Sequence, residues 1–159
     1  MKITILCVGK IKEKYLRDGI AEYSKRLGRY CKLEIVEVAD ERTPDRSSPA
    51  EETQIRRTEG ERLLRQIRPD DFVITLALQS RMPDSVELSR QIEILGIQGK
   101  SRLVFVIGGS LGLSDEVLSR GNDSISFSRL TFPHQLMRVI LLEQIYRGYR
   151  IMHHAPYHK

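Results

Sequence analysis

The sequence has little of what marks membrane-bound, secreted or metal-binding proteins. Its 159 residues include only two cysteines, Cys7 and Cys31, and two cysteines without a second pair do not make a zinc site. The apolar run that opens the chain is too short to cross a membrane, and residues 11–18 follow it with charges instead of a small-residue cleavage site. We therefore expect a cytoplasmic protein with reduced thiols, no membrane association and no metal site.

Several nucleotide-binding and hydrolytic motifs are also missing. Residues 108–112 read G-G-x-x-G at the fourth expected strand, and not the G-x-G-x-x-G that follows the first strand of dinucleotide-binding proteins. The "GKS" at 99–101 precedes a strand, whereas a P-loop follows one, and the G-x-S-x-G turn of hydrolases is absent. His154 and His158 are four residues apart, but Pro156 lies between them and prevents a helical metal pair.

The composition and the alternation of segments indicate one α/β domain over residues 1–159. Hydrophobic residues make up 40% of the chain and charged residues 30%. Strands are expected at 2–9, 31–38, 71–78, 102–109 and 124–128, and helices at 12–30, 50–67, 84–99, 114–120 and 133–152. This pattern predicts a mainly parallel sheet with helices on both faces, the 31–38 strand being half-buried and near an edge.

Three strand ends are candidates for one pocket, because ligands of such sheets bind beyond the carboxyl ends of the strands. They read "TLALQS" (75–80), "VIGGSLGLS" (106–114) and "SFSRLTF" (126–132). Glycines in the second let the backbone approach a ligand, although a tight strand-to-helix turn would explain them as well. His134, just inside the last helix, is either a structural hydrogen-bonding residue or a catalyst.

The last expected helix is apolar around most of its circumference, and a chain of this size cannot easily enclose it. We therefore expect part of it, including Leu142 and Ile145, to face another subunit, with Glu143 in an ion pair across the interface. The net charge is +5, and residues 147–159 contain no acid. That stretch fits a solvated tail or a phosphate-binding tail equally well.

A resemblance extends over the whole chain. The segments "VFVIGGSLGL" (104–113), "SFSRLTFPHQLMRVILLEQIYRGYRI" (126–151), the terminal "PYHK" and the opening "MKITILCVGKIKEKY" resemble the small SPOUT-class methyltransferases of the RlmH (YbeA) family, which modify a pseudouridine of bacterial 23S rRNA. The resemblance implies an α/β fold with a C-terminal trefoil knot. It further implies S-adenosylmethionine as cofactor, a homodimer packed through its last helices, and large-subunit rRNA or the assembled ribosome as partner.

The activity implied by the resemblance is N3-methylation of a pseudouridine in helix 69 of the large-subunit rRNA. The implied cofactor-binding residues are Leu76, Gly108, Phe127, Ser128, Arg129, Leu130, Thr131 and Phe132. The tail would reach the pocket of the partner subunit, where Tyr157 and His158 are candidates for handling the base or its proton. Arg129, Arg147 and Arg150 are candidates for holding rRNA phosphates at the pocket mouth.

The chain departs from its relatives at Ser80 and Arg81, where they often carry a glycine, and at His153 and His154. Two other functions stay open from the sequence. One is a non-catalytic RNA-binding module of the same fold. The other is a nucleotide-binding oxidoreductase, which the missing dinucleotide fingerprint disfavours.

Overall fold

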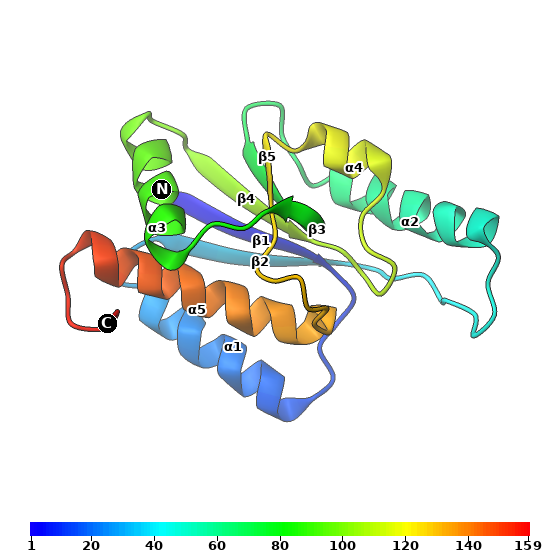
Figure 1. The fold of residues 1–159 in the computed structure, drawn as a ribbon, viewed down its shortest axis with the longest axis horizontal. Coiled ribbons are helices and arrows are strands. Elements are labelled where there is room, and N and C mark those ends of the chain that lie inside the picture. The colour runs from blue at the N-terminus through cyan, green and yellow to red at the C-terminus, as the bar shows by residue number, and fades with distance from the viewer.

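A computed structural model describes residues 1–159 as five strands and five helices that alternate along the chain (Figure 1). The strands are β1 (Lys2–Val8), β2 (Lys32–Val38), β3 (Phe72–Arg81), β4 (Arg102–Ile107) and β5 (Asp123–Ile125). The helices are α1 (Lys14–Leu27), α2 (Pro49–Leu64), α3 (Ser85–Ile97), α4 (Asp115–Arg120) and α5 (His134–Met152). The predicted order of elements is therefore confirmed.

The strands form one parallel sheet in the order β2-β1-β4-β3-β5. β4 lies in the middle and all six of its residues are buried, as expected for a strand covered on both faces. β2 lies at an edge and is only partly buried, which confirms the expectation for the 31–38 segment. All carboxyl ends meet at one edge of the sheet, where a ligand can contact several strands at once.

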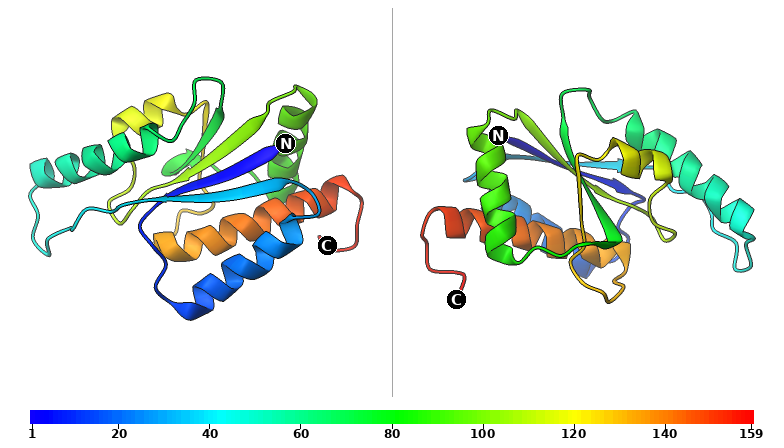
Figure 2. Two further views of the ribbon diagram at one scale, coloured as in Figure 1. Left: turned by 180° about the vertical axis from the view of Figure 1, so that it is seen from behind. Right: turned by 45° about the horizontal axis from the view of Figure 1, so that its top comes forward.

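The helices cover both faces of the sheet, which confirms the predicted α/β class. Alternate residues of β4 point to opposite sides: Phe105 packs with α1, α3 and α5, whereas Val104 and Val106 pack with α2 and α4. Figure 2 shows the two layers of helices on either side of the sheet. No helix combines the length and the apolar character needed to cross a bilayer.

Side chains fix where three of the helices begin. Ser48 starts α2 and Asp84 starts α3, each with its side chain bonded to the backbone three residues on and with a glutamate returning the bond. Ser114 caps α4 by accepting a bond from the Val117 N–H at 3.3 Å.

Two strand ends at the carboxyl edge differ from the prediction by three residues each. β3 continues past residue 78 to Arg81, because Gln79 adopts a left-handed conformation (φ 63°) and the chain then pairs again with β5. β5 ends at Ile125 and not at 128, since the hydroxyl of Ser126 donates to the carbonyl of Ser128 at 2.9 Å and closes a turn.

α5 lies in one layer between α1 and α3, so the prediction that Leu142 and Ile145 face another subunit is wrong. Both side chains are fully buried in the core of the protomer. The polar groups of α5 also bond within the chain, since Gln144 accepts a bond from Ser85 of α3 at 2.7 Å. Leu136 and Ile140, one helical turn apart, lie on the outward side, where Leu136 is 36% exposed.

A buried arginine anchors α5 to the carboxyl edge of the sheet. Arg138 is only 2% exposed, and its guanidinium donates to the carboxylate of Glu37 at 2.5 Å. It also donates to the backbone carbonyls of Val8 at 3.0 Å and Gly9 at 2.6 Å, where β1 ends. These bonds satisfy backbone groups that would otherwise be unpaired and fix the start of α5 beside the ends of β1 and β2.

Candidate active site

The three predicted strand ends meet in one cavity of about 820 Å³, a size typical of small-molecule sites. Its walls come from the end of β3 (76–78), the glycine loop after β4 (107–113) and the segment from β5 to α5 (125–135). Of the cofactor-binding residues implied by the resemblance, the cavity is lined by Leu76, Gly108, Phe127, Ser128, Leu130, Thr131 and Phe132. Arg129 does not line it and lies exposed beside it.

The glycine loop is shaped by contacts within the chain itself. A Cβ atom on Gly108 would lie 2.7 Å from the carbonyl carbon of Gly112, closer than atoms can approach. Gly112 has φ +83°, and Gly109 bridges to it across the turn. The tight-turn explanation of these glycines is therefore correct, and the same turn leaves their backbone lining the cavity.

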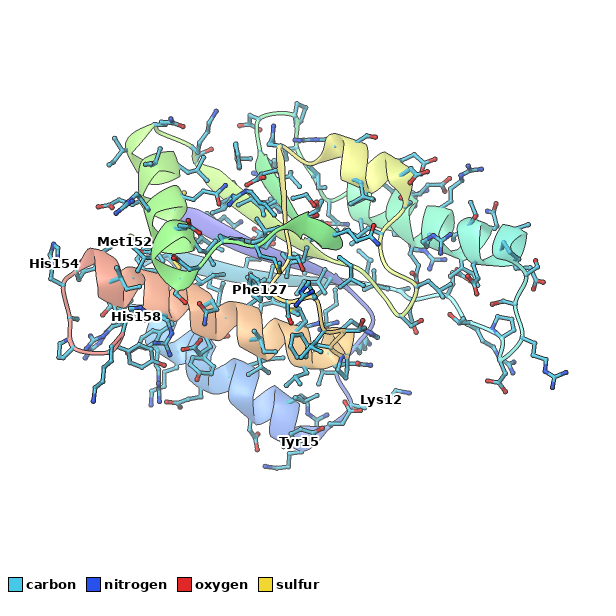
Figure 3. All side chains as sticks on the ribbon, viewed as in Figure 1. Lys12, Tyr15, Phe127, Met152, His154 and His158 are labelled. Atoms are coloured by element: carbon cyan, nitrogen blue, oxygen red, sulfur yellow. The ribbon has the colours of Figure 1, made fainter.

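The segment after β5 is folded on itself by its hydroxyls. The Ser128 hydroxyl accepts a bond from the Leu130 N–H at 2.9 Å, while the Ser128 carbonyl accepts one from Ser126. This turn holds Phe127 against the core of the sheet and leaves Leu130 70% exposed at the mouth of the cavity. Figure 3 shows Phe127 between the end of the sheet and the start of α5.

Ser80 and Arg81 stabilise the remaining wall. The hydroxyl of Ser80 lies 2.8 Å from that of Ser124 in β5. Arg81 donates to Asp123 at 2.5 Å and to Gln91 of α3 at 2.8 Å. A side-chain network thus fixes the path of the chain after Leu76.

His134 stands at the cavity wall and is half-buried. Burial and the neighbouring Arg138 cation lower its pKa, so the imidazole is neutral near pH 7. Asp40 and Glu13 lie close enough to oppose that shift. His134 and Gln135 also line a second, polar cavity of about 470 Å³ at the ends of β1 and β2.

This second cavity could not be recognised as a unit from the sequence. Its polar side chains come from three separate segments, and the contact of Arg138 with Glu37 joins residues 101 positions apart. A usable signal was present in the polar residues that directly follow the first two strands, such as Lys10 and Asp40.

Tyr157 and His158 lie outside the large cavity of their own protomer. The ring of Tyr157 packs edge-on against Tyr146 at 5.0 Å, and its hydroxyl donates to Glu143 at 3.2 Å. His158 Nδ1 lies 3.2 Å from a guanidinium nitrogen of Arg147. Burial and the Glu143 carboxylate raise the pKa of Tyr157 to about 12, so its hydroxyl is a hydrogen-bond donor at neutral pH.

Arg147 and Arg150 are not at the cavity mouth of their own protomer. From His134 to Arg147 the helix rises roughly 20 Å at 1.5 Å per residue. Arg147 pairs with Glu143 at 2.6 Å within α5, so that carboxylate is already paired inside the protomer. Arg150 donates to the Tyr30 hydroxyl at 3.0 Å. Of the three predicted phosphate contacts, only Arg129 lies beside the large cavity.

Comparison with known proteins places this geometry in a family. Residues 1–158 match the family model described as a predicted SPOUT methyltransferase. The chain belongs to the SPOUT methyltransferase family. It is 60% identical to proteins named ribosomal RNA large subunit methyltransferase H from Bifidobacterium adolescentis and Clostridium tetani, over 159 residues and the full length of each. The expected resemblance and the expected class of enzyme, a methyltransferase, are therefore confirmed.

A solved structure supports the fold assignment of this SPOUT family member. A probable methylase family protein from Haemophilus influenzae superimposes with a TM-score of 0.56 at 13% identity. The match covers 99% of this chain and 70% of the other. At that identity the likeness shows the arrangement of the sheet and helices.

Replacing Gly108 should disturb the glycine loop even without a ligand. Gly108→Ala places a methyl group against the Gly112 backbone, and we expect the free energy of unfolding to fall by about 1–3 kcal/mol. Gly96→Ala is the control, because the nearest atom to its Cβ is 3.8 Å away and alanine favours the helix. Urea unfolding of both variants tests this. An unchanged midpoint urea concentration for Gly108→Ala would show that the loop accommodates the methyl group without loss of stability.

Proposed function

We propose that residues 1–159 form a single SPOUT methyltransferase domain that uses S-adenosylmethionine to methylate N3 of a pseudouridine in helix 69 of the large-subunit rRNA. The protein acts as a homodimer in the cytoplasm, on rRNA or the assembled ribosome. One observation carries the proposal: three strand ends build a single cavity in a chain that is 60% identical, over its full length, to proteins named as large-subunit rRNA methyltransferases.

The residues of the large cavity fit S-adenosylmethionine. Leu76, Phe127 and Leu130 offer apolar surface for an adenine ring, and the closely turned backbone at Gly108 offers N–H and carbonyl groups without side chains in the way. The turn at Ser128 presents further backbone groups at the opposite wall. When bound, the cofactor supplies an electrophilic methyl group on a sulfonium. The chain has to orient the base and keep water out.

The proton on N3 of the base also has to leave. Tyr157 is suited to donate a hydrogen bond to the base, because its pKa is raised to about 12. The imidazole of His158 is suited to take the proton once it is released from Arg147. Both act at the pocket of the partner subunit in this proposal, because neither lines the cavity of its own protomer.

The trefoil knot belongs to the same proposal. In Figure 1 the segment from β3 to α3 crosses in front of the segment from β5 to α5. The two touch at the crossing, where the Ser126 N–H donates to the Arg81 carbonyl at 2.8 Å. α5 then continues to the far side of that crossing and packs between α1 and α3, as a threaded chain would.

Cofactor binding and rRNA mapping test the activity together. We expect calorimetry to show binding of S-adenosylmethionine and none of NAD. Mass mapping of rRNA nucleosides should show one methylated pseudouridine that is missing in cells without the gene and restored by the wild-type gene. Binding of neither cofactor would favour the non-catalytic RNA-binding module, and an unchanged nucleoside map would rule out the proposed substrate.

The homodimer is tested on the outward side of α5. Ile140→Glu should yield a folded monomer, because a charge replaces an apolar side chain at the proposed interface. Leu142→Glu is the contrast, since Leu142 is fully buried and the change should unfold the protomer itself. Sedimentation and circular dichroism separate the two effects. A wild type that sediments as a monomer at micromolar concentration would contradict the homodimer.

The tail is tested by deletion of residues 155–159. We expect the free energy of unfolding to fall by only about 1–3 kcal/mol, because the deletion removes one aromatic contact between Tyr157 and Tyr146 and one hydrogen bond from Tyr157 to Glu143. Methyl transfer should fall by ~100-fold or more, with cofactor affinity less affected. Tyr157→Phe and His158→Ala then separate the hydroxyl from the imidazole. Wild-type turnover by the truncated protein would remove both residues from the site.

A further inference from the structure

The polar cavity beside the large one has no role in the function described so far. It lies at the carboxyl ends of β1 and β2, has a volume of about 470 Å³, and shares His134 and Gln135 with the large cavity. The two cavities therefore share a wall at these side chains, at the start of α5. A molecule seated in the polar cavity lies next to a methyl donor in the large one.

The lining of this cavity mixes cations with hydrogen-bond acceptors. Lys10 and Lys12 supply ammonium groups on the exposed segment that follows β1. Asp40 and Glu13 supply carboxylates, and Glu37 gives one oxygen to Arg138. This set can hold a phosphate at the lysines while the carboxylates accept ring N–H groups of a base.

An exposed aromatic ring follows the two lysines of the cavity in the chain. Tyr15 is 72% exposed in the first turn of α1. Figure 3 shows Lys12 and Tyr15 at the same end of that helix. A cationic surface near an exposed aromatic ring is typical of proteins that bind single-stranded nucleic acid, because bases stack on the ring and phosphates pair with the lysines.

We propose that the polar cavity and its rim of Lys10, Lys12 and Tyr15 bind a nucleotide of the substrate RNA beside the methyl donor. The inference rests on the proposed function. The acceptors Asp40 and Glu13 suit the ring N–H or amino groups of a base that flanks the target pseudouridine, whose own N3 has to face the methyl donor in the large cavity. A further base of the same strand stacks on Tyr15, and His134, neutral and half-buried, lies between the flanking base and the donor.

Binding and turnover of charge and aromatic variants test the inference. The probes are ribosomes from cells that lack the gene and, in a second arm, free 23S rRNA. Tyr15→Ala should weaken binding about 10-fold through lost stacking. Lys12→Ala should weaken RNA binding less at high salt than at low salt. The slope of the logarithm of the binding constant against the logarithm of the salt concentration should become shallower by about 0.7. Asp40→Ala should raise the KM for RNA about 10-fold with little change in S-adenosylmethionine affinity.

Lys25→Ala is the matched control, since Lys25 is an exposed lysine in the last turn of the same helix. It should bind both probes like the wild type. Melting curves confirm that each variant is folded. Wild-type RNA affinity and KM in all three rim and cavity variants would overturn the inference. If the wild type binds the probes but methylates neither, the proposed function fails while the binding comparison still decides the role of this cavity.

Discussion

The structure depends on one guanidinium placed where water cannot reach it. Arg138 comes from the last helix and bonds to the ends of the first strand and to Glu37 of the second. A buried cation is costly to desolvate, so these bonds have to be kept for the helix to stay in place. Because α5 starts at the wall of both cavities, the same contact holds that shared wall in place.

The carboxyl edge of the sheet is divided between two kinds of surface. On one part, the glycine turn and the segment after β5 expose backbone groups and apolar side chains. On the other, lysines and carboxylates stand at the ends of β1 and β2. A reaction between an adenosine-containing donor and a nucleotide of RNA needs both kinds of surface side by side, since the donor has to be kept dry while the RNA stays hydrated along its phosphates.

Much of this arrangement could be predicted from the sequence. Hydrophobic periodicity gave the order of elements, and the rule about strand ends selected the segments around Leu76, Gly108 and Phe127, which the chain brings together in one cavity. The resemblance supplied the family, which periodicity alone could not, because a fold of this class hosts many functions.

The misses have physical causes. The bulge at Gln79 extended β3, and no local pattern marks a non-glycine residue with positive φ. The apolar side chains around α5 predict contact with a partner subunit. In the structure α1 and α3 cover the flanks of the helix, and only a stripe near Ile140 faces outward. The polar cavity was missed because its side chains meet only after the chain has folded.

The strand order also constrains how the protein can be made. β1 is synthesised before β2 and β4, yet it lies between them, and its end is bonded by an arginine 130 residues further along. Such distant contacts form slowly, because a long loop has to close before they contribute. During synthesis the apolar side of β1 therefore stays uncovered until most of the chain has emerged. A nascent chain halted before α5 exposes this apolar surface, to which chaperones bind.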